Sequence, residues 1–72
     1  MRVRIRIDTG ADARKFVEIA TKATKPVFIT DGDGLKVSAK SLLGALYAME
    51  FDELWCESED DIYHTIEDFI II

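Results

Sequence analysis

Arginine alternates with a branched aliphatic residue at the start of the chain, in the run Met-Arg-Val-Arg-Ile-Arg-Ile. A period of two is that of a β-strand, and it places the arginines on one face and the aliphatic side chains on the other. We therefore predict a strand over residues 2–7 with one face in a core and one face in water. A sheet built on such a strand is covered by helices on one side only.

Three further strands are predicted from alternation and turn residues. Residues 27–30 and 35–37 flank an Asp-Gly-Asp-Gly segment, whose glycines supply the positive φ angles of a tight hairpin turn. Residues 53–57 alternate again, with Leu54 and Cys56 on one face. The hairpin turn lacks the further oxygen ligands and the bidentate glutamate that close a calcium loop, so we predict no metal site there.

Two helices are predicted between the strands. The first covers residues 13–23, with Asp12 as its N-cap, and ends before Pro26 because the residue preceding proline avoids the α region. The second lies within residues 38–49, where Ser38 and Ser41 can each cap a helix and apolar residues follow at helical spacing. This second helix is apolar on more than one face, and the surplus predicts a docking surface.

A third helix is predicted after the last strand. Ser58 precedes three acidic residues, in the pattern of a capping box. The residues expected to form one apolar stripe on this helix are Ile62, Ile66, Phe69 and Ile70. The predicted order is therefore β-α-β-β-α-β-α, an α+β fold, and residues 1–72 form one domain of a size that buries a modest core.

Charge is divided unevenly along the chain. Residues 1–25 carry a charge of +4 and residues 26–72 carry −9, giving the net charge of −5. We expect strands of opposite charge to lie side by side, because such cross-strand pairs are favourable by roughly 0.2–1 kcal/mol each. Three arginines in an acidic chain neutralise few phosphates, so nucleic acid is not an expected partner.

The chain has one cysteine, Cys56, and no uninterrupted apolar segment at its start. An internal disulfide is therefore excluded, and neither a membrane span nor a signal segment is expected. We expect a cytoplasmic protein with no cofactor.

The order of elements and two motifs resemble the HPr family, the histidine-containing phosphocarriers of the bacterial sugar phosphotransferase system. The segment Val37-Ser-Ala-Lys-Ser-Leu-Leu-Gly44 is similar to the regulatory segment of that family, and Thr9-Gly-Ala-Asp-Ala-Arg14 is similar to its active-site loop. The similarity extends from about Ile5 to Phe69. It implies an open-faced β-sandwich, with an antiparallel sheet in the order 1-4-2-3 and three helices on one face.

The resemblance fails where the family does its chemistry. Asp12 stands at the position of the phosphoryl-accepting histidine and Lys15 at that of the following proline, while Arg14 is retained. A carboxylate there would repel an incoming phosphate, and acyl phosphorylation normally needs a metal held by further acids. His64 has no partner in the sequence to complete a catalytic constellation. We therefore predict a degenerate phosphorylation site at Asp12 and Arg14, and no enzyme.

The second motif is intact. Ser41 matches the family serine that a dedicated kinase phosphorylates, and phosphate there would gain from the helix dipole; the alternative is a simple N-cap. Leu42, Leu43 and Leu46 fall where the family docks its partners, whereas Tyr47 and Met49 depart from the family pattern. The sequence leaves the oligomeric state open.

Three functions remain open on the sequence. The leading hypothesis is a non-catalytic HPr-like protein acting by protein contact, with regulation of sugar uptake or carbon metabolism as one possible role. The first alternative is a phosphocarrier with a non-histidine acceptor, Asp12 or His64. The second is a ferredoxin-like interaction module, which would have the strand order 4-1-3-2.

Overall fold

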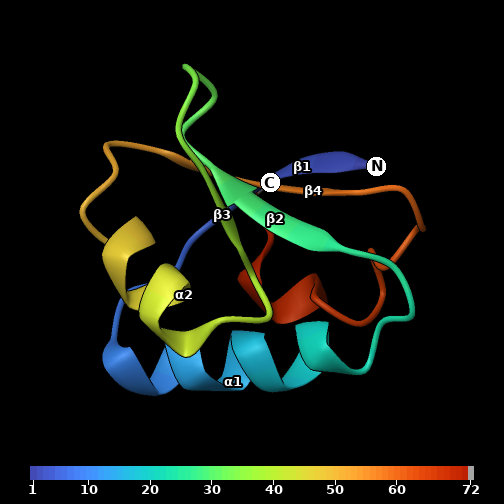
Figure 1. Ribbon diagram of the computed structural model, residues 1–72. Coiled ribbons are helices and arrows are strands. Elements are labelled where there is room, and N and C mark those ends of the chain that lie inside the picture. The colour runs from blue at the N-terminus through green and yellow to red at the C-terminus, as the bar shows by residue number, and fades with distance from the viewer. Residues whose placement is uncertain (72) are drawn as a thin grey trace.

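A four-stranded antiparallel sheet forms one layer and two α-helices cover one of its faces (Figure 1). The computed structural model describes residues 1–71. The elements in chain order are β1 (Arg2–Ile5), α1 (Gly10–Thr21), β2 (Val27–Thr30), β3 (Lys36–Ser38), α2 (Leu42–Ala48), β4 (Leu54–Ser58) and a 3-10 helix, η1 (Glu67–Phe69). The predicted α+β class is confirmed.

The strands lie in the order β1-β4-β2-β3, as predicted. A ferredoxin-like sheet would place the first strand between the third and the fourth, so that alternative is wrong. The register sets opposite charges side by side on the open face of the sheet. Glu57 of β4 lies 3.2 Å from Arg2 of β1 and 3.2 Å from Lys36 of β3. The predicted pairing of oppositely charged strands is thus confirmed.

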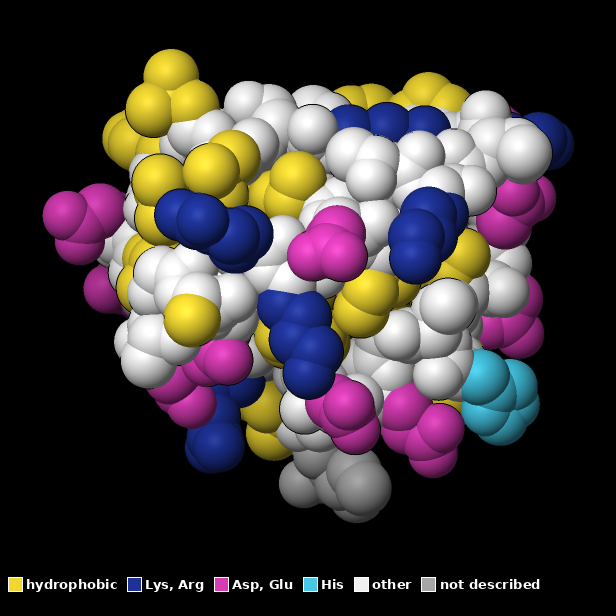
Figure 2. Space-filling view, turned by 90° about the horizontal axis from the view of Figure 1, so that it is seen from below, with side chains coloured by type: hydrophobic (Ala, Val, Ile, Leu, Met, Phe, Trp, Pro, Cys, Tyr) yellow, Lys and Arg dark blue, Asp and Glu magenta, His cyan; other side chains and the backbone are white. Residues whose placement is uncertain are grey.

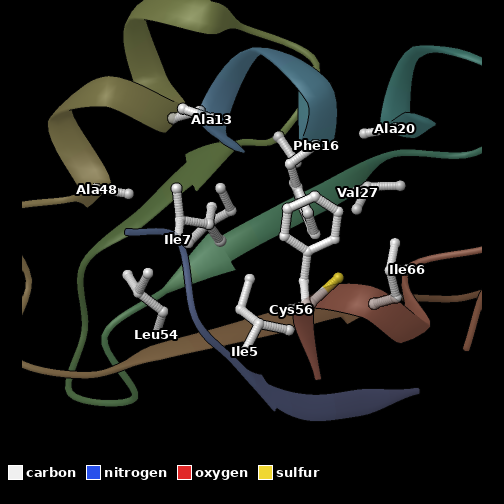
Figure 3. Packing of buried hydrophobic residues seen from close by; sticks show 14 residues of the cluster. Ile5, Ile7, Ala13, Phe16, Ala20, Val27, Ala48, Leu54, Cys56 and Ile66 are labelled. Carbon is white, nitrogen blue, oxygen red and sulfur yellow. The ribbon is translucent and has the colours of Figure 1, made fainter. Parts of the chain in front are cut away.

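The core fills the space between the sheet and α1 (Figure 3). Ile5, Ile29 and Cys56 come from three neighbouring strands and are at most 1% exposed. Phe16 of α1 is fully buried above them, and its ring meets that of Phe69 edge to face, with the centroids 5.1 Å apart. The two faces predicted for residues 53–57 are correct, because Leu54 and Cys56 face this core.

Helix α1 begins three residues earlier than predicted. Its N-cap is Thr9, whose Oγ1 accepts a hydrogen bond from the backbone N–H of Asp12 at 3.0 Å. The Asp12 carboxylate in turn accepts from the backbone N–H of Asp8 at 3.3 Å. Asp12 is therefore the third residue of the helix and not its cap. Threonine and aspartate both cap helices. A helix that begins after Thr9 forms about one more turn of backbone hydrogen bonds than a helix that begins after Asp12.

The predicted third α-helix is wrong. Ser58 cannot begin it, because Ser58 is the last residue of β4 and its backbone N–H donates to the Met1 carbonyl at 3.0 Å. Turns follow, and then only η1, since this segment is rich in β-branched and aspartate residues of low helix propensity. Of the predicted apolar stripe, Ile66 and Phe69 are nevertheless buried.

The end of the described chain pairs with β1 instead of forming a helix. The N–H of Arg6 donates to the Phe69 carbonyl at 2.8 Å, and the N–H of Ile71 donates to the Arg4 carbonyl at 3.0 Å. Ile70 forms an isolated antiparallel bridge with Ile5. These bonds require an extended backbone, and they cover the outer edge of β1.

The β2–β3 hairpin rises above the open face of the sheet (Figure 1) and reaches Trp55. Gly32 has φ +79°, and a Cβ there would lie 3.1 Å from Trp55 Nε1. Gly34 has φ +115°, and a Cβ there would meet no atom within 4 Å.

We expect Gly32→Ala and Gly34→Ala each to lower the free energy of unfolding by about 1 kcal/mol or more through backbone strain. Only Gly32→Ala should also shift the emission of Trp55, measured by fluorescence during urea unfolding. Equal emission spectra in the two variants would contradict the contact.

Candidate functional site

The exposed apolar side chains of α2 form the most prominent surface feature of the helical layer. We call the set Leu42, Leu43, Leu46 and Tyr47 the α2 patch; their exposed fractions are 37%, 79%, 40% and 55%. Figure 2 shows hydrophobic side chains gathered on the helical face, on the side where α2 lies in Figure 1, with Lys and Arg side chains beside them.

The composition of α2 explains why its large residues face outward. The helix turns Ala45 and Ala48, both 0% exposed, toward the core. Gly44 lies against β3, where a Cβ would approach the Ser38 carbonyl oxygen to 3.0 Å. Small residues on the inner side let α2 lie close to the sheet and to α1. The leucines predicted for partner binding are therefore left exposed.

Ser41 lies at the edge of the α2 patch as the N-cap of α2. Its Oγ accepts a hydrogen bond from the backbone N–H of Gly44 at 3.1 Å, and the residue is exposed. The predicted capping role is therefore confirmed, while the hydroxyl remains accessible from solvent.

The α2 patch adjoins the start of α1, which carries Asp12 and Arg14, the residues of the predicted degenerate phosphorylation site. A Cβ on Gly10 would lie 4.0 Å from Leu46 Cδ2. Arg14 lies one helical turn after Gly10, on the same side of α1, and is exposed. Among residues 1–71 no carboxylate lies within ion-pair distance of Arg14. The two segments of the family resemblance thus meet on one side of the helical layer.

Asp12 is held by the two residues that precede α1, Asp8 and Thr9. Its carboxylate accepts the Asp8 N–H, and it lines a small hollow of about 210 Å³. The other residues lining this hollow are Arg6, Asp8, Lys15, Asp68, Phe69, Ile70 and Ile71. Arg6 pairs with Asp8 at 3.0 Å. In the described part of the chain, no group of three or more His, Cys, Asp or Glu side chains is placed to hold a metal ion.

His64 lies apart from the α2 patch, in the turns after β4. It is 92% exposed, and its Nδ1 lies 3.7 Å from Glu67 Oε2. The expected helix around it is absent, and its ring meets that of Tyr63 edge to face, with the centroids 5.8 Å apart. Among residues 1–71, no hydrogen bond joins the His64 ring to a hydroxyl or a thiol, and no hydrogen bond joins it to Asp12.

The open face of the sheet carries a second cluster of aromatic and charged side chains. Two guanidinium groups lie over the ring of Trp55, with Arg2 Cζ at 4.7 Å and Arg4 Cζ at 5.7 Å from the ring centroid. The Nε1–H of Trp55 donates a hydrogen bond to the Glu53 carboxylate at 2.7 Å. The register of β1 on β4, which pairs Arg4 with Trp55, places these arginines over the ring. Arg6 instead pairs with Asp8.

A hollow of about 500 Å³ lies at one end of this open face. It is lined by Met1, Arg2, Pro26, Phe28, Lys36, Glu57, Ser58 and Glu59. Glu57 forms ion pairs with both Arg2 and Lys36, so the charges in the hollow are largely paired. No local sequence pattern predicts this hollow, because it is formed by residues from four strands and their flanking loops.

Cys56 lies at the bottom of the core and is chemically protected. Burial raises the pKa of its thiol from 9.0 to about 11, with the N-terminal ammonium group lowering the pKa and Glu57 raising it by smaller amounts. A thiol with this pKa is neutral at physiological pH and is neither a nucleophile nor a metal ligand.

Within residues 1–71, no helix has the length and apolar character needed to cross a lipid bilayer. Comparison of the chain with family models, curated proteins and solved structures found no match.

Proposed function

We propose that the chain is a non-catalytic, HPr-like protein that acts by binding another protein through the α2 patch, with a regulatory role in sugar uptake or carbon metabolism. The observation that carries the proposal is the exposure of three leucines and a tyrosine on α2, directly beside the start of α1. An apolar surface of this kind on a small domain is typical of a protein-binding site. The 1-4-2-3 strand order agrees with the fold that the resemblance implies.

The state of Asp12 supports a non-catalytic role. Its carboxylate accepts the backbone N–H of Asp8, just before α1, so a bound phosphate would compete with it for this donor. Three carboxylates, those of Asp8, Asp12 and Asp68, line the hollow against two cationic side chains, Arg6 and Lys15, and Arg6 is already paired with Asp8. An incoming phosphoryl group would meet repulsion there rather than a free anion site.

Phosphoryl transfer from enzyme I of the phosphotransferase system tests the proposal directly. Incubation with enzyme I and labelled phosphoenolpyruvate should leave this chain unlabelled, while a histidine-containing HPr in the same reaction becomes labelled. Acid-labile label on the chain that disappears in Asp12→Asn or His64→Ala would contradict the proposal. It would establish the phosphocarrier alternative instead.

Docking through the α2 patch predicts competition with a histidine-containing HPr for enzyme I. An excess of this chain should slow HPr labelling, and Leu43→Asp should abolish that inhibition. Because Leu43 is 79% exposed, the same variant should change the free energy of unfolding by no more than about 0.5 kcal/mol. Leu42→Asp should weaken docking as well, with a larger stability loss because Leu42 is 37% exposed.

Tyr63→Asp is the matched control, because Tyr63 is also 37% exposed but lies in the turns after β4. The Tyr63→Asp variant should slow HPr labelling as strongly as the unaltered chain does. Loss of inhibition in this control would show a general charge effect and not docking through α2.

We further propose Ser41 as a switch of the same surface. A phosphate on Ser41 would lie at the N-terminus of α2, beside Leu42 and Leu43, and would add nearly two negative charges to an apolar contact. Mass spectrometry of the protein purified from its own cells, grown on rich and on poor carbon supply, tests this. Finding Ser41 unmodified in both conditions would leave it a helix cap only.

A further inference from the structure

The two edge strands of the sheet differ in whether another segment pairs with their outer side. The outer edge of β1 is covered by residues 69–71, through the bonds of Arg6 to Phe69 and of Ile71 to Arg4. β3 forms the other edge, and within residues 1–71 no strand or bridge pairs with its outer side. An uncovered edge is a template for a further strand.

The register identifies the free backbone groups of β3. Ala39 donates to the Val27 carbonyl at 2.7 Å and Asp31 donates to the Leu35 carbonyl at 3.2 Å, so the odd-numbered residues of this strand point toward β2. Lys36 and Ser38 therefore point their N–H groups outward. Among the described residues neither N–H has a hydrogen-bond acceptor, and the Lys36 carbonyl has no donor.

The one charged side chain of β3 does not block this edge. A lysine on an edge strand commonly deters pairing by projecting from it. The Lys36 ammonium group is instead turned over the open face, where it lies 3.2 Å from Glu57 Oε1 and 4.9 Å from the centroid of the Phe28 ring.

Apolar side chains flank the edge on the helical side. Val37 packs against the start of α2, because a Cβ on Gly44 would lie 3.4 Å from Val37 Cβ. Tyr47 follows Gly44 by three residues and shares its side of α2, and it is 55% exposed. Leu35, two residues before Val37 on the same face of the strand, is 49% exposed.

We propose that the outer edge of β3 binds an extended peptide segment of a partner protein by strand addition. The N–H groups of Lys36 and Ser38 and the Lys36 carbonyl bond its backbone. Its side chains on the helical side are apolar and contact Leu35, Val37 and Tyr47, while those on the open-face side are polar and lie beside Lys36. An extended chain with apolar residues at alternate positions matches both the spacing and the chemistry of this edge.

A second copy of the chain fits less well. Two β3 strands pairing edge to edge would contribute three residues each, a contact far below the roughly 1,200 Å² of a stable interface. A longer partner segment extends past the strand onto Leu35 and Tyr47.

Hydrogen exchange with a model peptide tests the proposal without any substitution. The probe is a capped peptide of sequence Thr-Val-Glu-Val-Thr-Val, which is extended and alternating. In the free protein the Lys36 and Ser38 amides should exchange rapidly, and saturating peptide should slow both by at least about tenfold.

The Lys36→Pro variant removes one outward donor and should weaken peptide binding by about tenfold, whereas Lys36→Ala keeps the donor and should bind the peptide normally.

The outcomes separate this proposal from docking through the α2 patch. Leu46 lies on the α1 side of α2, so Leu46→Asp should leave peptide binding intact while it disrupts the α2 patch. Peptide binding lost in Leu46→Asp but kept in Lys36→Pro would overturn strand addition. A second contradicting result combines two observations: slow exchange of the Lys36 and Ser38 amides in the free protein, and a dimer in sedimentation equilibrium. A second copy of the chain would then occupy the edge of β3. An absence of protection in the presence of peptide would also overturn it.

Discussion

Replacing Phe16 by alanine is expected to cost about 3–5 kcal/mol of unfolding free energy. Phe16 is the largest fully buried side chain, and its ring packs edge to face on Phe69 at 5.1 Å. The variant loses the apolar burial of the ring, leaves a cavity under α1 and removes the support of the residues that cover β1. Since a domain of this size has a stability of only about 5 kcal/mol, the variant should be largely unfolded at 25 °C.

Urea unfolding followed by circular dichroism measures the effect. Phe16→Leu is the matched control, because it keeps most of the buried volume and should cost less than about 2 kcal/mol. Phe69→Ala removes the other ring of the pair and should approach the loss of Phe16→Ala. A loss below 1 kcal/mol in Phe16→Ala would contradict the packing shown in Figure 3.

Alkaline pH is expected to destabilise the protein through Cys56. Burial raises the pKa of the folded thiol to about 11 from an ordinary value of 9.0. Below pH 9 the thiol is protonated in both states, so its contribution to stability is complete. As pH rises from 9 to 11 only the unfolded chain releases the proton, and the protein loses about 2–3 kcal/mol from this group.

The dependence is measured as the free energy of urea unfolding at pH values from 7 to 11. Cys56→Ala provides the control, since it removes the titrating group; it lowers stability at every pH but should flatten the slope between pH 9 and 11. Every other side chain is the same in both proteins, so the difference between their slopes reports on Cys56. Identical slopes in the two proteins would contradict the assignment to Cys56.

Local patterns in the sequence were sufficient to predict the strands and the faces they present. Alternation placed Leu54 and Cys56 in the core and Trp55 on the open face, and the structure agrees. Such patterns succeed because a one-residue shift in register would bury every polar side chain of a strand.

Competition between neighbouring signals limited the prediction of the helices. Thr9 and Asp12 are both good caps, and only the completed turn shows that Thr9 begins α1. Ser58 is also a good cap, but the sheet uses its backbone N–H as the last donor of β4. The failed third helix is therefore a case in which pairing with distant residues outweighs local propensity. Two of the four residues of the predicted apolar stripe, Ile66 and Phe69, are buried all the same, because burial depends on composition more than on backbone form.

The candidate sites were predictable to different degrees. The leucines of α2 could be identified from the surplus of apolar residues, and Ser41 from its capping pattern. The hollow over Phe28 could not, because it is formed by side chains of all four strands. The edge position of β3 follows from the strand order, which the family resemblance implied and the structure shows. Strand order is a property of the whole chain, and no local pattern encodes it.

The position of β4 affects how the protein folds as it leaves the ribosome. β4 lies between β1 and β2, so these first two strands have no partner in common until residues 54–58 are available. A nascent chain that stops before this point holds only the β2–β3 hairpin and its helices, and β1 has no strand to pair with. Completion of the sheet must therefore wait for almost the whole described chain, and it requires contacts between residues far apart in sequence, which is typical of slow steps in folding.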